Sequence, residues 1–197
     1  MNGAYVPEFE QVIAAGGIVL FPSDTVYGLA CDPENQQAIR RLYAIKQRPP
    51  EKPSARMFFD LDSALAALPQ LLARAAAEPA ALGAHTQTAL MALLPGPVTV
   101  ILNGGVGLRV VDVPQLRGAR IAVLQSSANR SGQPDAKSLQ LVDPLVSGAV
   151  DLQIDGGTLP GCASTVIDLR DYEQHASWQV LREGALSLAR IAELLSR

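Results

Sequence analysis

A short apolar run that ends at a proline and opens into a polar turn constrains the fold of this chain more than any other feature. Residues 16–48 read GGIVLFPSDTVYGLACDPENQQAIRRLYAIKQR. The apolar run at 18–21 follows two glycines and is stopped by Pro22, which favours a buried strand over the start of a helix. The turn at 23–27 is rich in hydroxyls, and Gly28 allows a ligand or another strand to approach the backbone closely. The stretch therefore predicts a strand end that grips a small polar molecule.

The segment after this turn predicts a helix that delivers two cations. Asp32 is expected to be its N-cap and Pro33 its first helical residue. Apolar residues then recur at helical spacing, at Ala38, Ile39, Leu42 and Ile45. Lys46 and Arg48 follow, ahead of two prolines. Two cations suit the C-terminal end of a helix dipole, and they are also well placed to meet a phosphate chain.

The rest of the chain mixes helices and strands without regular alternation. Helices are predicted at 8–15, 86–94, 138–145 and 188–195. A further helix is predicted to start at Asp62, to be interrupted at Pro69 and to continue through an alanine-rich stretch to 81. Strands are predicted at 98–101, 107–111, 120–124, 152–154, 164–169 and 178–182, and 49–53 reads as a rigid connector. Several turns between strands are short enough for hairpins. We therefore expect an α+β fold, a twisted mixed β-sheet with flanking helices, in one domain that spans 1–197.

Composition excludes several classes of protein. Hydrophobic residues make up 48% of the chain and charged residues 18%, as in ordinary globular proteins. No basic start precedes an apolar core at the N-terminus, and no run approaches the roughly 20 apolar residues that span a bilayer, so a cytoplasmic protein without membrane contact is expected. The net charge of -3 argues against a large nonspecific nucleic-acid surface. Cys31 and Cys162 are expected to be free thiols.

Familiar catalytic motifs are missing from the sequence. It contains no GxxxxGK[ST] phosphate loop, no GxGxxG after a strand, and no HExxH or CxxC metal pattern, and its two histidines have no motif around them. No protein-bound metal site is predicted. Hydroxyl, amide and cationic side chains near predicted strand ends remain, namely Ser23, Thr25, Lys46, Arg48, Arg109, 126–129, Ser164, Thr165 and Arg182. Such a set suits the binding of anions and polar ligands.

Seven segments, taken in order, resemble the YrdC-like threonylcarbamoyl-AMP synthases. They are FPSDTVYGL at 21–29, KQRPPEKP at 46–53, LPGPVTVIL at 94–102, LRVVDVP at 108–114, SSANRSGQP at 126–134, ASTVIDL at 163–169 and LREGAL at 181–186. Any one of them would be weak, but their shared order is specific and spans nearly the whole chain. The resemblance implies a YrdC-like open α/β cavity over the sheet. It also implies synthesis of threonylcarbamoyl-AMP from L-threonine, bicarbonate and ATP, with release of pyrophosphate, for the threonylcarbamoyladenosine (t6A37) modification of tRNA.

The resemblance also assigns roles to residues. The catalytic tetrad falls on Lys46, Arg48, Ser127 and Asn129, which would surround ATP together with Arg182, whereas Ser23, Thr25, Arg109, Ser126 and Ser164 would meet threonine. ATP is a substrate, and Mg²⁺ would be held mainly through its phosphates. Because a carbamate oxygen attacks the α-phosphorus, catalysis would rest on positioning and charge neutralisation. The product would pass to a tRNA threonylcarbamoyl transferase complex, with weak or absent direct contact to tRNA.

A structural alternative stands beside each assignment. The two cations could form a solvated helix end, Ser127 and Asn129 could shape a turn, Ser23 and Thr25 could satisfy backbone groups, and Arg109 could lie exposed on a strand. A second function is also open, a YrdC-like paralogue that binds a nucleotide or double-stranded RNA without performing the synthesis. A third is a carbamoyl-adenylate activity like that of hydrogenase maturation proteins, whose zinc-finger and acylphosphatase segments do not accompany this sequence.

The sequence departs from the family pattern at several positions. Ser23 replaces a threonine, a valine replaces the proline of the LRVVDVP segment, and Ser54 and Arg56 replace apolar strand residues. Met57 stands where some relatives have a histidine near threonine. The stretch between Arg109 and Ser127 is also shorter than expected, which predicts a reduced wall on one side of the cavity.

Overall fold

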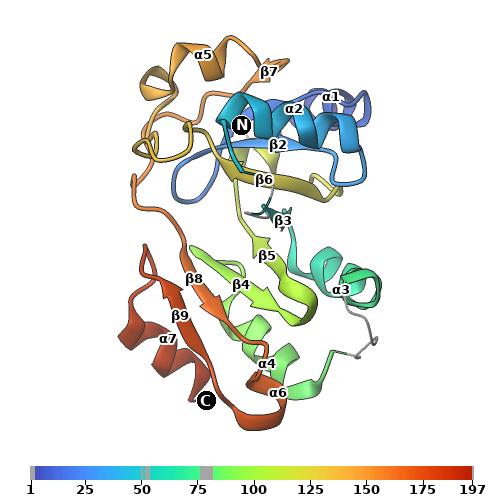
Figure 1. The fold of residues 1–197 in the computed structure, drawn as a ribbon, viewed down its shortest axis with the longest axis vertical. Helices are drawn as coiled ribbons and strands as arrows, with labels where there is room; N and C mark the ends of the chain where they lie inside the picture. Colours follow the sequence, from blue (N-terminus) through green and yellow to red (C-terminus); the bar gives the residue numbers. More distant parts are fainter. Residues whose placement is uncertain (1–2, 50, 52–53, 76–81, 197) are drawn as a thin grey trace.

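A computed structural model describes residues 3–49, 51, 54–75 and 82–196 of the chain. Within these residues, nine strands form one sheet in the order β7-β1-β2-β6-β3-β5-β4-β8-β9 (Figure 1). The strands are β1 (Val19–Pro22), β2 (Tyr27–Cys31), β3 (Ala55–Phe58), β4 (Val98–Leu102), β5 (Val106–Val110), β6 (Val123–Ser127), β7 (Leu152–Gln153), β8 (Thr165–Asp168) and β9 (Gln179–Arg182).

The sheet is mixed and twisted, as the sequence predicts. The pairs β1–β2, β4–β5 and β8–β9 are antiparallel neighbours in the chain. Short turns join the first two pairs, whereas the link from β8 to β9 contains a short helix. Parallel pairing joins β1 to β7, β3 to β5 and β4 to β8. In Figure 1, β2 and β6 run across the view whereas β8 and β9 run down its length, so the two ends of the sheet differ strongly in direction. The expected twisted mixed sheet with flanking helices is confirmed.

Helices cover the sheet and close three apolar clusters. The helices are α1 (Val6–Ala14), α2 (Gln36–Lys46), α3 (Leu61–Ala75), α4 (Ala84–Leu93), α5 (Pro144–Ser147), α6 (Tyr172–His175) and α7 (Leu188–Leu195). Leu68, Leu90 and Ile191 bring α3, α4 and α7 into one cluster over β4, β5 and β8. Phe9 of α1 packs edge-on against Phe59, with ring centroids 5.4 Å apart. The third cluster includes the buried apolar residues of α2. The polar residues at the strand ends in the middle of the sheet belong to none of the three clusters.

Two predicted helix starts are wrong for the same physical reason. The helix α2 begins at Gln36, because the Asn35 side chain caps it by accepting hydrogen bonds from the backbone N–H groups of residues 37 and 38, each at 3.0 Å. Asp32 instead accepts a bond from the Glu34 N–H and turns the chain ahead of the helix. In α3, Asp60 rather than Asp62 accepts the bond from the Ser63 N–H, at 2.7 Å. Competing polar side chains close together make a cap hard to place from sequence.

The predicted interruption at Pro69 is also wrong, since α3 continues through it. Leu68 and Leu72 are buried on either side of the proline. Core packing along this face outweighs the lost backbone hydrogen bond, which costs about 3 kcal/mol in an isolated helix. The alanine-rich continuation predicted for 76–81, and residues 50, 52 and 53 of the predicted connector, lie outside the described residues.

The helix predicted for 138–145 is replaced by two short pieces. A 3₁₀ turn covers Leu139–Leu141, and α5 starts at Pro144 with Asp143 as its cap. The proline holds Asp143 in an extended conformation, so one continuous helix cannot form. The strand β2 and the short helix α6 were not predicted, and β6 covers 123–127 instead of 120–124. Ser126 and Ser127 therefore belong to the end of a strand.

Candidate functional site

The polar strand ends converge on a cavity of about 200 Å³. Its wall includes Thr25 from the β1–β2 turn, Arg109 from β5, Ser126 and Ser127 from β6, Ser164 just before β8, and Arg182 from the end of β9. Arg48, two residues beyond α2, also lines it. Seven residues that the sequence marks as candidates thus share one wall, although they come from distant parts of the chain.

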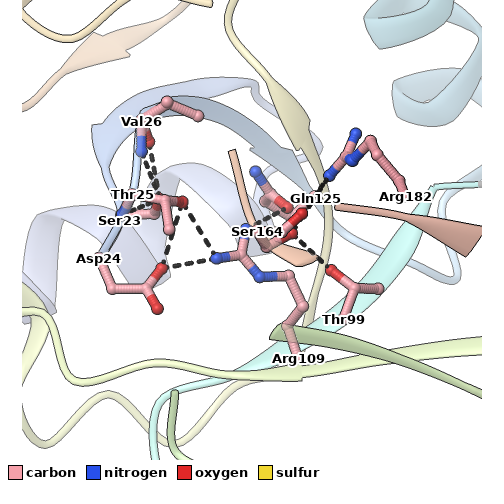
Figure 2. A network of polar contacts seen from close by, with 9 residues as sticks. All are labelled: Ser23, Asp24, Thr25, Val26, Thr99, Arg109, Gln125, Ser164 and Arg182. Carbon is pink, nitrogen blue, oxygen red and sulfur yellow. Dashed lines mark hydrogen bonds and ion pairs between the residues drawn. The ribbon is translucent and has the colours of Figure 1, made fainter. Parts of the chain in front are cut away.

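The turn at one end of the cavity is held by Ser23 (Figure 2). The buried Ser23 hydroxyl donates to the Val26 carbonyl at 2.7 Å and accepts from the backbone N–H groups of Thr25 and Val26 at 3.2 and 3.3 Å. Of the two predicted hydroxyls, that of Thr25 lies on the cavity wall, whereas Ser23 is not among the described lining residues. A serine suffices for this task because only its oxygen is used.

Arg109 lies across the floor of the same region and is buried, with 4% of its surface exposed. Its Nη2 donates to the Asp24 carboxylate at 2.5 Å and to the Thr25 hydroxyl at 3.3 Å, and its Nη1 donates to the Gln125 side chain at 3.4 Å (Figure 2). Burial lowers the pKa of Arg109 and raises the pKa of Asp24, while their mutual attraction opposes both shifts. The alternative of an arginine exposed on a strand is therefore wrong.

The opposite side of this network is built on Ser164. Its hydroxyl lies 2.9 Å from that of Thr99, and Arg182 donates to the Ser164 carbonyl at 2.8 Å and to its hydroxyl at 3.3 Å. Figure 2 shows Thr99 and Arg182 approaching Ser164 from different strands. The structure thus places Arg182, predicted for ATP, directly beside a residue predicted for threonine.

Lys46, Ser127 and Asn129 of the predicted tetrad form one contiguous group. Lys46 is 2% exposed, and its ammonium donates to the backbone carbonyls of Ser127 and Asn129 and to the Asn129 side-chain oxygen. That same side-chain oxygen accepts from the Ser127 hydroxyl at 2.5 Å. Burial, together with the charge of Arg48, lowers the pKa of Lys46 to about 8, and Asp135 opposes the shift. A solvated helix end is excluded for Lys46.

Two residues of the predicted tetrad line the cavity, and the other two lie behind its wall. Among the described residues, the cavity lining includes Arg48 and Ser127 but neither Lys46 nor Asn129. The Arg48 guanidinium lies 5.9 Å from the centre of the Tyr43 ring, a distance at which cation and ring attract. Asn129 uses its amide nitrogen on the Gln133 carbonyl, so its side chain shapes the turn 127–133.

Four polar residues at or beside the cavity have no role in the sequence analysis: Asp24, Thr99, Gln125 and Asp135. Asp24 stood inside the recognised turn but received no role. Thr99 and Gln125 are each buried within a strand whose neighbours are largely buried. A polar side chain inside such a strand needs a hydrogen-bond partner, which is the signal that could have drawn attention to both.

The departures from the family pattern have different structural outcomes. Ser54 lies on the cavity wall, and its backbone N–H donates to the Tyr43 hydroxyl at 3.1 Å. Arg56 pairs with Glu34 at 2.9 Å. Met57 is fully buried in the apolar cluster around Phe9, so it packs into the core.

Other features of the chain bound the chemistry. Cys31 is buried and Cys162 is exposed, and both are free thiols as predicted. Over the described ranges, no three or more histidine, cysteine or acidic side chains gather as a metal-binding group. None of the helices in the described parts of the chain is long and apolar enough to cross a membrane.

Comparison with known proteins identifies relatives along most of the chain. Residues 11–184 match the Sua5/YciO/YrdC family model, which is described as "Telomere recombination". A threonylcarbamoyl-AMP synthase of Pseudomonas savastanoi pv. phaseolicola is 35% identical over 192 residues, covering 91% of this chain and 97% of the relative. One from Xanthomonas campestris pv. campestris is 29% identical over 172 residues, covering 77% and 87%.

Solved structures share the fold. P. abyssi Sua5 in complex with L-threonine is 26% identical with a TM-score of 0.77; the match covers 96% of this chain and 56% of that one. This chain thus spans little more than half the length of that Sua5. The E. coli protein YciO, at 22% identity and a TM-score of 0.76, matches 94% of this chain and 92% of its own length.

Proposed function

This chain belongs to the Sua5/YciO/YrdC family, and from that premise we propose that it joins L-threonine, bicarbonate and ATP into threonylcarbamoyl-AMP and releases pyrophosphate. The observation that carries the proposal is the buried guanidinium of Arg109 on the wall of a hydroxyl-lined cavity. Its Nε is buried without a hydrogen-bond partner among the described residues. An unsatisfied arginine donor beside a cavity suits the carboxylate of an amino acid, which accepts such bonds strongly.

The threonine end of the site is assigned to one group of side chains. Arg109 would bind the carboxylate, and the hydroxyls of Thr25, Ser126 and Ser164 offer donors and acceptors for the amine and the β-hydroxyl. Ser23 supports this end by fixing the turn that carries Thr25. The complex of P. abyssi Sua5 with L-threonine supports the assignment, because that protein shares the fold over 96% of this chain.

The nucleotide end is assigned to the other candidates. Arg48 and Ser127 on the wall would meet the phosphates and the adenylate, with Lys46 and Asn129 directly behind them. Arg182 lies between the two ends, since it bonds Ser164 and also lines the cavity. It is suited to hold the phosphate nearest the amino acid, where both substrates react.

The reaction needs positioning more than a protein nucleophile. The amine of threonine adds to bicarbonate with loss of water to give a carbamate, and a carbamate oxygen then attacks the α-phosphorus while pyrophosphate leaves. Arginine donors already fixed in the wall would stabilise the charge that develops on the phosphate oxygens. Mg²⁺ would supply further neutralisation of that charge. Asp135, the one carboxylate among the described lining residues, fits a metal that binds through few protein groups and substrate phosphates.

The product would serve the t6A37 modification of tRNA through a separate transferase, and the protein would work in the cytoplasm. The test is to incubate the purified protein with ATP, Mg²⁺, bicarbonate and labelled threonine, and to measure pyrophosphate and the adenylate. Both should appear only when threonine is present. Pyrophosphate without threonine, or none at all, contradicts the proposal; ATP binding without any product would instead favour the paralogue that binds nucleotides only.

A further inference from the structure

Lys46 and Arg48, which are separated by one residue in the sequence, point in different directions in the structure. Gln47 between them adopts the left-handed conformation, with φ 50° and ψ 41°. Its N–H bonds to the Ala44 carbonyl and the Arg48 N–H bonds to the Tyr43 carbonyl, at 3.1 and 2.9 Å, which ends the helix in a tight cap. This reversal sends Lys46 into the interior and leaves Arg48 on the cavity wall.

The ammonium of Lys46 has its hydrogen-bonding capacity occupied. It carries three N–H groups, and three oxygens accept from it: the carbonyls of Ser127 and Asn129 and the side-chain oxygen of Asn129. To bind a phosphate directly it would have to release one of these buried oxygens, which would then lack a partner. The side chain is also absent from the cavity lining that the described residues form.

The backbone of Lys46 holds the same turn. Its carbonyl accepts from the Ser131 N–H at 2.8 Å, and the neighbouring Ala128 N–H bonds to the Tyr27 carbonyl at 2.7 Å. Two carbonyls that converge on one point repel each other unless a cation or strong donor lies between them, and the buried ammonium supplies it. Residues 127–131 are therefore fixed to the end of α2 from both the side chain and the main chain of one residue.

We propose that Lys46 is a positioning residue that clamps the turn 127–131, whereas Arg48 is the cation that contacts the phosphates. This inference rests on the proposed function, which assigns the phosphates of ATP to the side of the cavity that Arg48 lines. The clamp sets the position of Ser127 on the cavity wall, so losing it displaces a substrate contact without removing a charge from the wall. It replaces the sequence-based expectation that both cations neutralise the triphosphate directly.

A matched pair of variants, Lys46→Met and Arg48→Met, separates the two roles. Amide hydrogen exchange at Ala128 and Ser131 should be at least about tenfold faster in Lys46→Met and unchanged in Arg48→Met, because only the former opens the turn. Binding of inorganic tripolyphosphate, measured by calorimetry, should weaken about tenfold in Arg48→Met and less than about threefold in Lys46→Met. In the synthesis assay, Lys46→Met should lower kcat about 30-fold with little change in KM for ATP, whereas Arg48→Met should raise KM.

The opposite pattern would overturn the clamp: tripolyphosphate binding weakened as much in Lys46→Met as in Arg48→Met, with exchange at Ala128 and Ser131 unchanged. If Lys46→Met does not fold, the wild-type protein supplies the test. Opening the turn frees Lys46 and returns its pKa from about 8 to its ordinary value of 10.5. Exchange at these two amides, corrected for the intrinsic effect of pH, should therefore slow as pH rises from about 8 to 10, and protection that does not change with pH would refute the proposal. Exchange and tripolyphosphate binding need no turnover. They decide the clamp even if the wild type makes no adenylate, which would refute the proposed function alone.

Discussion

The carboxylate of Asp24 lies 2.5 Å from the guanidinium of Arg109, in a region where both side chains are largely withdrawn from water. The second oxygen of Asp24 is buried without a hydrogen-bond partner among the described residues. The ion pair is therefore a fixed element of the site, holding one edge of the guanidinium so that the remaining donors face a defined direction.

Asp24→Asn should destabilise the protein by about 3 kcal/mol, because it leaves the buried charge of Arg109 uncompensated. The double variant Asp24→Asn with Arg109→Met should recover part of this loss, since it removes the unpaired charge. The free energies of unfolding in urea check both values. A single variant as stable as the wild type would show that the pair contributes nothing to the fold.

Arg109→Lys should raise the KM for threonine about 30-fold and change the KM for ATP less than about threefold, because an ammonium cannot keep the bonds to Asp24 and Gln125 and also supply a donor where Nε lies. Arg117→Lys is the matched control, since Arg117 forms an exposed pair with Asp112 and is not among the described residues that line the cavity. The control should match the wild type in initial-rate measurements. An equal rise in the two KM values would remove Arg109 from the threonine end.

Gly28→Ala should weaken threonine binding and lower the melting temperature. A Cβ at this position would lie 2.6 Å from the Gln125 side-chain nitrogen and 3.3 Å from the Ser126 carbonyl. Gln125 would have to move, and it carries one of the bonds to Arg109. We expect a loss of about 1–3 kcal/mol, typical of overpacking in a well-filled interior, from thermal and urea unfolding. Unchanged stability together with unchanged threonine affinity would show that Gln125 has room to adjust.

The buried Lys46 should make the free energy of unfolding rise with pH over the range in which activity falls. The pKa of Lys46 falls from 10.5 to about 8 on folding. Between these values the unfolded chain binds more protons than the folded one, so this residue's contribution to stability increases as pH rises. The gain across the window is about 3 kcal/mol. Activity should decline in the same range, because the neutral amine has only two N–H groups for three oxygens.

Urea unfolding of the wild type and of Lys46→Met at pH 7, 8, 9 and 10 measures this effect. The difference in unfolding free energy should move in favour of the wild type as pH rises, and the activity limb near pH 8 should be absent from the residual rate of the variant. A difference that is independent of pH would mean that the buried lysine titrates as it does in the unfolded chain.

The parts of the fold that sequence could predict are those that depend on local pattern. The apolar run at 18–21, the helix that ends at Lys46 and the strand after Pro97 all carry strong periodicity, and each appears where it was expected within a few residues. The strand β2 was missed because Gly28 and Ala30 have weak strand preference, and burial on both faces removes the alternation that marks a strand. Pro69 misled because its local cost is outweighed by distant core contacts.

The candidate site followed a similar division. The ordered motifs named Thr25, Arg48, Arg109, Ser164 and Arg182, all of which the structure places on one cavity. They could not distinguish a residue on the wall from one behind it, because that depends on which way a side chain leaves its element. Lys46 and Ser23 illustrate this, since both turn their polar atoms onto backbone groups.

The cavity draws its wall from both ends of the chain, with Thr25 contributed before β2 and Arg182 by the last strand of the sheet. A ribosome makes these parts in order, and among the strands that the structure describes β9 pairs only with β8, at the edge of the sheet. During synthesis, early segments can collapse onto their own apolar clusters while the site has no far wall. The growing polypeptide therefore acquires its substrate cavity only after Arg182 has been released and has docked beside Ser164.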